Sequence, residues 1–292
     1  MLVTPLPGTH PENLLNAMRS VHQHARSLYE GGPDDTYQRL IAYLNWSSNA
    51  VRMLRGQLRG ADLDRLVLTR RHAALLDGVG HLAGSDQASL VLGLVRLELE
   101  ERLEDFEQAI RDYEHVTQRW RAPLRLLVPD SSLFVKHPTQ LEETDIAALI
   151  GGGPEPVHVL VPMMVVDELD RLKESKDRHV RWRAGYSLAV IDRLLRKSPR
   201  PVLFPADSRE DPDAPPRGEV TVEVLLDPPA HARLPNADDE IVDRAVVAQS
   251  VSSTPVTLVT YDTGQATRGH HAGLRVRHLR DDAGTGPEPE KK

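Results

Sequence analysis

Residues 124–132 read LRLLVPDSS, a short apolar run that ends at Pro129 and Asp130. Similar short runs with the character of β-strands follow at residues 157–161, 220–226, 256–260 and 274–276. Segments with helical periodicity lie between them, at residues 139–150, 163–174, 178–197, 237–250 and 264–271. Strands that alternate with helices predict a parallel α/β sheet, whose functional site forms at the carboxyl ends of the strands.

The chain before this region has a different pattern. Apolar residues in residues 11–121 recur three and four positions apart, which predicts an all-helical region. The longest stripe has a large apolar residue every seven positions, at Leu92, Leu99, Phe106 and Tyr113. This stripe fits the core of a helical bundle better than a coiled-coil dimer, and we expect Glu98 and the acids after it on the solvated side. Any homodimer or other protein partner is expected to bind through these helices.

The change of pattern sets the expected domain boundaries. Residues 1–121 form the helical N-terminal region, and residues 122–280 form the α/β domain. Within that domain, residues 198–218 are rich in Pro and charge, which predicts an exposed loop or insertion. The composition of residues 281–292 predicts a disordered tail.

Composition excludes several classes of protein. The chain has no cysteine, so disulfides, thiolate zinc sites and cysteine nucleophiles are ruled out. The first residues lack the basic and apolar regions of a secretory signal, and no apolar stretch is long enough to span a bilayer. We therefore expect a cytoplasmic protein that does not associate with a membrane.

The charge is unevenly distributed along the chain. The formal net charge is −7, but residues 171–200 contain ten Lys and Arg and only three acidic residues. Such a segment could hold the phosphate backbone of a nucleic acid, with Lys173, Lys176 and Arg178 as the candidate contacts. The alternative interpretation is an ordinary solvated helix surface.

Acidic residues recur where the predicted strands end or the predicted helices begin. Asp130 and Asp262 each follow a strand, Glu168 lies about two turns into a helix, and Asp238 and Asp239 open another helix. Taken singly, each could be a turn, cap or solvated helix residue. Together they predict a cluster of carboxylates at one edge of one sheet.

The chemistry of such a cluster points to a metal. Neighbouring carboxylates repel each other unless a cation lies among them, and a set of oxygen ligands without cysteine favours Mg²⁺ or Mn²⁺. These metals serve phosphoryl chemistry. The chain has no P-loop motif, and Ser131 and Ser132 follow Asp130 where a haloacid-dehalogenase-like phosphatase would have Asp-x-Asp.

Four segments in this order resemble the motifs of PIN-domain nucleases: VPDSS at 128–132, PMMVVDELDRLK at 162–173, NADDEIVDRA at 236–245 and VTYD at 259–262. The resemblance covers about residues 124–279. It implies a parallel-sheet nuclease fold and divalent-metal-dependent cleavage of phosphodiesters, most often in RNA.

Carried over position by position, the resemblance assigns the catalytic and metal-binding acids as Asp130, Glu168, Asp238 and Asp262. Asp239 directly follows Asp238 and shares or takes its place as a metal ligand. Thr260 falls where the family often has a hydroxyl, and we expect it to contact substrate. The predicted function is therefore a metal-dependent endoribonuclease, and the alternative is a non-catalytic RNA-binding or scaffold protein that keeps the fold.

Overall fold

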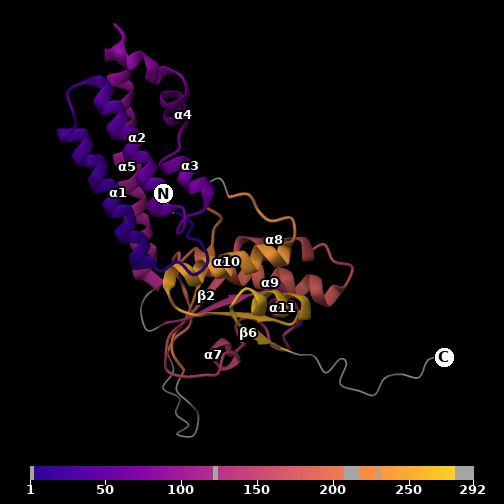
Figure 1. The fold of residues 1–292 in the computed structure, drawn as a ribbon. Coiled ribbons are helices and arrows are strands. Elements are labelled where there is room, and N and C mark those ends of the chain that lie inside the picture. Colours follow the sequence, from indigo (N-terminus) through magenta and orange to yellow (C-terminus); the bar gives the residue numbers. More distant parts are fainter. Residues whose placement is uncertain (1–2, 121–123, 207–216, 229–230, 280–292) are drawn as a thin grey trace. The chain divides into compact units, whose positions relative to one another are not determined.

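The computed structural model describes residues 3–120, 124–206, 217–228 and 231–279 (Figure 1). The chain divides into two compact units, one formed by Met1–Trp120 with Ser250–Ser253 and the other by Arg121–Gln249 with Thr254–Lys292. The predicted tail, 281–292, and the part of the predicted insertion at 207–216 lie outside the described residues. No helix in the described ranges is both long and apolar enough to cross a membrane.

The N-terminal unit is helical, as the sequence predicts. Its elements are α1 (Pro11–Gly31), α2 (Thr36–Leu54), α3 (Gly60–Leu66), α4 (Arg70–Asp77), the 3₁₀ helix η1 (Val79–Gly84) and α5 (Ala88–Trp120). The long helix α5 packs against α1 and α2. Leu99, Phe106 and Tyr113 are fully buried in this packing, so most of the seven-residue stripe forms the core of the unit.

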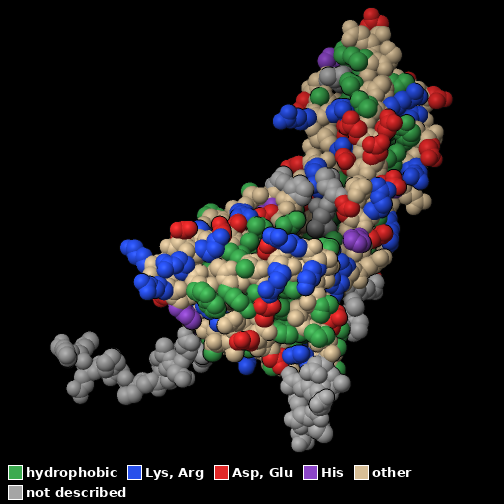
Figure 2. Space-filling model, turned by 180° about the vertical axis from the view of Figure 1, so that it is seen from behind, with side chains coloured by type: hydrophobic (Ala, Val, Ile, Leu, Met, Phe, Trp, Pro, Cys, Tyr) green, Lys and Arg blue, Asp and Glu red, His purple; other side chains and the backbone are tan. Residues whose placement is uncertain are grey.

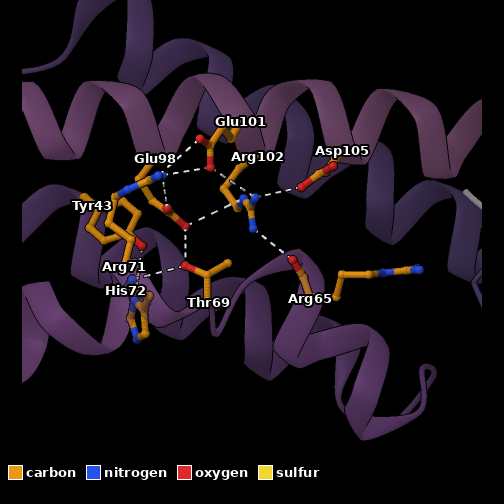
Figure 3. Close-up of polar contacts among 9 residues, drawn as sticks. All are labelled: Tyr43, Arg65, Thr69, Arg71, His72, Glu98, Glu101, Arg102 and Asp105. Atoms are coloured by element: carbon orange, nitrogen blue, oxygen red, sulfur yellow. Dashed lines mark hydrogen bonds and ion pairs between the residues drawn. The ribbon is translucent and has the colours of Figure 1, made fainter. Parts of the chain in front are cut away.

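Glu98 departs from the expectation for the acids of α5, because its side chain is fully buried. The carboxylate accepts hydrogen bonds from Thr69 Oγ1 at 2.7 Å and from Arg71 at 2.8 Å, and Arg102 Nε lies 3.6 Å away (Figure 3). The helices α1 and α2 cover one side of α5, and α3, α4 and η1 also pack against it. The buried side of α5 is therefore wider than the apolar stripe. The prediction that Glu98 is solvated was therefore wrong.

The C-terminal unit contains a mainly parallel sheet. Its strands, in chain order, are β1 (Arg125–Pro129), β2 (Val157–Pro162), β3 (Val202–Phe204), β4 (Val220–Leu225), β5 (Val256–Thr260) and β6 (Arg275–His278). Its helices are α6 (Ser131–Lys136), α7 (Ile146–Leu149), α8 (Met163–Leu172), α9 (Arg178–Leu195), α10 (Ala237–Ser252) and α11 (Thr263–His271). The predicted α/β class is confirmed.

The order of the strands is β3-β4-β2-β1-β5-β6, which puts β1 between β2 and β5. Every residue of β2 is buried, and four of the five in β1 are. Central parallel strands are covered on both faces, which explains why they read as continuous apolar runs rather than as alternating ones. Asp130 and Asp262, which follow β1 and β5, therefore leave the same edge of the sheet from adjacent strands.

Two local features differ from the sequence-based expectation. The strand β3 lies inside the Pro-rich segment 198–218 and pairs antiparallel with β4, where we expected only loop. The helix expected over 139–150 is reduced to α7, and the helix α6 begins directly after Asp130 instead. Thr144 Oγ1 donates to the Gln140 carbonyl at 2.7 Å, so the chain before α7 closes into a turn rather than a helix.

Candidate active site

Asp130 is the most buried of the predicted acids. It follows β1 as the N-cap residue of α6, and 4% of its surface is exposed. Its Oδ2 atom accepts hydrogen bonds from Ser132 Oγ at 2.6 Å and from Thr260 Oγ1 at 2.8 Å. Burial of a carboxylate is costly unless its oxygens are hydrogen-bonded, and these two hydroxyls provide the bonds.

The same two hydroxyls tie Asp130 to the turn that carries Asp262. Thr260 Oγ1 accepts a hydrogen bond from the Asp262 backbone N–H at 2.8 Å. Ser132 Oγ accepts one from the Tyr261 N–H at 2.9 Å. The ends of β1 and β5 are thus joined by side-chain bonds in addition to strand pairing. Asp262 itself is exposed and caps α11, with Oδ1 accepting from the Gln265 N–H at 2.8 Å.

Glu168 reaches the same edge of the sheet from α8, the helix that follows β2. Burial raises the pKa of Glu168, a hydrogen bond from Ser131 opposes this rise, and the charges of Asp130 and Asp238 reinforce it. Because the two aspartates act on Glu168 electrostatically, the three carboxylates share one neighbourhood.

Asp238 and Asp239 lie in the first turn of α10, where Asn236 Oδ1 accepts from their backbone N–H groups at 2.8 and 3.3 Å. Their side chains meet Arg268 of α11. Arg268 Nε lies 2.9 Å from Asp239 Oδ1, and Arg268 Nη1 lies 3.4 Å from Asp238 Oδ2. Arg268 therefore holds Asp239 more closely than Asp238.

Asp238 is coupled to the acids of the strand ends. Burial raises its pKa, Arg268 opposes the rise, and the charges of Asp130, Asp262 and Asp239 add to it. Asp239 is exposed. Of the two adjacent aspartates, Asp238 is thus the one that faces the carboxylates from β1 and β5.

The donor set fits a hard divalent cation. Carboxylates from four separate elements act on one another electrostatically, and burial together with these like charges raises the pKa of Glu168 and of Asp238. Oxygen ligands of this kind suit Mg²⁺ or Mn²⁺, which would relieve the repulsion.

A second cluster lies in the loop before α10. Among the described residues, Asp227, His231 and Glu240 have ligand atoms that all lie within 4.8 Å of one another. The fully buried Glu240 accepts from His231 Nε2 at 2.7 Å and from the Leu234 N–H at 2.8 Å, and Arg233 binds Asp227. These bonds fasten the loop to α10 and so fix where the first turn of α10 begins. No local sequence pattern indicates this contact, because Glu240 reads as one more acid of a helix start.

The predicted phosphate contacts lie at the turn between α8 and α9. Lys173 is exposed and pairs with Asp170 at 2.6 Å, and Lys176 and Arg178 are exposed without an ion pair to any described acid. In Figure 2, Lys and Arg side chains gather at the left-hand edge of the C-terminal unit, where the α8–α9 hairpin of Figure 1 projects in the reversed view. Arg183 of the same segment points inward instead, donating to the Phe134 and Thr139 carbonyls.

Sequence reasoning missed two contributors to the site. Ser132 was part of the VPDSS segment, and its hydroxyl is one of the two that hold Asp130. Arg268 lies in the predicted helix 264–271, for which no functional role was predicted, and it supplies a positive charge to Asp238 and Asp239. A hydroxyl residue two positions after a strand-end acid was the available signal for Ser132. No local pattern pointed to Arg268.

Comparison with known proteins identifies the family. A search of curated proteins gave no match. The family model of the PIN domain matches residues 127–280, which include the whole carboxylate cluster. The chain belongs to the PIN-domain family.

Proposed function

We propose that this chain is a divalent-metal-dependent endoribonuclease. PIN domains are a nuclease-type fold family, so a nuclease is the starting point. The observation that carries the proposal is the electrostatic coupling of Glu168 and Asp238 to Asp130, since these carboxylates come from three different elements. A structural role alone would not require like charges to be gathered in this way.

The proposed metal ligands are Asp130, Glu168, Asp238 and Asp262, with Asp239 at the rim of the site. A divalent cation bound there would neutralise charge on the phosphodiester and promote ionisation of water. Ser132 and Thr260 fix the orientation of the Asp130 carboxylate, and Thr260 acts through Asp130 rather than by touching substrate. Attack of water on phosphorus would break the bond to the 3′ oxygen, leaving 5′-phosphate and 3′-hydroxyl ends.

The RNA backbone would be held by the exposed cations Lys173, Lys176 and Arg178. We expect the reaction in the cytoplasm. The N-terminal unit has exposed apolar side chains, including Tyr37 and Leu76, which suit contact with a second copy or another protein. Molecular mass measured by light scattering, on wild type and on Leu76→Ser, tests that part of the proposal.

One observation favours a non-catalytic RNA-binding or scaffold protein. Arg268 already pairs with Asp238 and Asp239, so a protein cation occupies part of the space next to the acids. Among the described residues Arg268 forms no ion pair with Asp130, Glu168 or Asp262, and these three acids keep the cluster negative. We therefore favour the nuclease.

The deciding experiment compares wild type, Asp130→Asn and Asp64→Asn. RNA cleavage and thermal melts are measured with Mn²⁺, with Mg²⁺ and with EDTA. Asp130→Asn keeps an oxygen for the two hydroxyls but loses the charge, so it should lose most cleavage and most of the Mn²⁺-induced rise in melting temperature. Asp64 is an exposed acid of the N-terminal unit and lies outside the cluster, so its variant should behave as wild type. RNA binding without cleavage by wild type would establish the scaffold alternative.

A further inference from the structure

The C-terminal unit exposes a large aromatic side chain on α9. The chain has three tryptophans, and Trp46 and Trp120 are buried at 7% and 3% exposure, whereas Trp182 is 52% exposed. Trp182 stacks on Tyr186, with ring centroids 5.2 Å apart and an angle of 18° between the planes. An exposed pair of stacked rings offers a flat surface to another ring.

Polar contacts of Tyr186 hold the stacked rings in place. The Tyr186 hydroxyl donates to Glu142 Oε2 at 2.7 Å, and Glu142 also pairs with Arg193. These bonds fix the Tyr186 ring, and Tyr186 in turn restricts Trp182. A preorganised aromatic surface loses little conformational entropy when a ligand ring stacks on it.

Exposed cations lie near the stack, and of the three named here only Lys173 pairs with a described acid, Asp170. Arg178 lies one turn before Trp182 on the same helix, and Arg181 precedes it directly. Both are exposed, and neither forms an ion pair with a described acid, although Arg181 donates to the Ser175 carbonyl. Lys173 Cγ lies 3.9 Å from the position that a Cβ at Gly185 would take, so its stem passes beside the same face. Repeated phosphates next to unpaired bases match this arrangement of charges and rings.

The stack is anchored to the elements that carry the acids. Arg183, next to Trp182, donates to the Phe134 carbonyl of α6 at 3.1 Å, and α6 begins directly after Asp130. The same guanidinium also donates to the Thr139 carbonyl, in the chain that follows α6. The aromatic surface is thus anchored to the helix that begins directly after Asp130.

We propose that Trp182 and Tyr186 form a stacking subsite for an unpaired nucleobase of RNA, with Arg178 and Lys173 holding the adjacent phosphates. The subsite rests on the proposed function, because the RNA that it binds is the proposed substrate. Binding of RNA to the subsite can nevertheless be measured in the absence of hydrolysis. Duplex RNA cannot present an unstacked base to this surface, so the subsite selects single-stranded segments.

The test uses the full chain in EDTA and a fluorescein-labelled single-stranded RNA of about 12 nucleotides, followed by anisotropy. Trp182→Ala should weaken binding by about 5- to 100-fold, the range for loss of one stacked base. Trp182→Phe keeps a ring and should stay within about threefold of wild type. The matched control is Tyr29→Ala, because Tyr29 is an aromatic residue of the N-terminal unit with 38% exposure, and its loss should change affinity by less than about twofold.

A scan of the RNA locates the stacked base. In a series of RNAs that each carry one abasic nucleotide at a different position, binding to wild type should be weakened at one position, counted from the labelled end. Binding to Trp182→Ala should not depend on the position of the abasic nucleotide. Equal affinity of wild type and Trp182→Ala overturns the proposal, as does an equal loss of affinity for duplex RNA. A change in molecular mass with unchanged RNA affinity also overturns it, in favour of a protein interface.

Failure of the subsite and failure of the nuclease proposal give different results. If wild type binds RNA through Trp182 but does not cleave it with Mn²⁺, the subsite stands and the nuclease proposal falls. If wild type cleaves RNA and Trp182→Ala binds as tightly as wild type, the nuclease proposal stands and the subsite falls.

Discussion

Thr260 offers the sharpest test of how the site is built. Its hydroxyl is fully buried, donates to Asp130 Oδ2 at 2.8 Å and accepts from the Asp262 N–H at 2.8 Å. Thr260→Val has nearly the same shape but removes both hydrogen bonds. Thr260→Ser keeps the hydroxyl and removes only a methyl group, so the pair of variants separates hydrogen bonding from packing.

The expected magnitude follows from the two bonds. A hydrogen bond to a buried charged group contributes about 1.5–3 kcal/mol, and the partly buried Asp262 N–H without an acceptor costs about 1 kcal/mol. The two contributions sum to about 2.5–4 kcal/mol, and Thr260→Val should fall toward the lower end of this range because Ser132 still donates to Asp130. Loss of the methyl group in Thr260→Ser costs about 1 kcal/mol.

Calorimetry measures the difference between the two variants. The transition of the C-terminal unit is recognised by its upward shift on addition of Mn²⁺. At about 2–4 °C per kcal/mol for a unit of this size, Thr260→Val should melt several degrees below Thr260→Ser. Mn²⁺ should also stabilise Thr260→Val less, because Asp130 is less firmly oriented. Equal melting temperatures for the two variants would show that the hydroxyl does not join the strand ends.

Three further predictions concern charge. The raised pKa of Glu168 means that its ionised form destabilises the metal-free fold. Glu168→Gln should therefore have a higher melting temperature than wild type at about pH 8, and this difference should disappear as the pH falls below about 4. Melting temperatures measured over a series of pH values test this. Arg268→Gln removes the cation beside Asp238 and should bind Mn²⁺ about two- to fivefold more tightly in calorimetric titration; weaker binding would contradict competition between Arg268 and the metal. Glu98→Ala should destabilise the N-terminal unit by about 3–5 kcal/mol in urea unfolding, while the exposed Glu100→Ala serves as control.

The strands that position the candidate site could be predicted from sequence because their signals are local. The strands β1, β2 and β5 are buried on both faces and therefore read as apolar runs with an acid or helix start at the end. Once these strands are taken as parallel, Asp130 and Asp262 must leave the same edge. The start of α10 was also visible, because acids such as Asp238 and Asp239 favour the first turn of a helix.

What escaped prediction depends on partners far away in the chain. The strand β3 has three residues and exists because β4 offers it an edge. Glu98 reads as a solvated acid until α4 brings Thr69 and Arg71 to it. Arg268 gains its place in the site from the approach of α10. None of these contacts can be recognised from a short segment of sequence.

The central position of β1 also has a consequence for how the chain acquires activity. One edge of β1 pairs with β2, and the other pairs with β5, which lies about 130 residues later in the chain. Contacts between residues this distant in sequence are slow to form. Ribosomes add about 5–20 residues per second, so Asp130 is synthesised on the order of ten seconds before Asp262. A nascent or truncated chain that ends before β5 has Asp130 and Glu168 but lacks Thr260 and the turn after it. The proposed hydrolytic site would thus be assembled only after β5 and the turn that follows it have been translated, so a shorter nascent chain would lack the complete set of carboxylates.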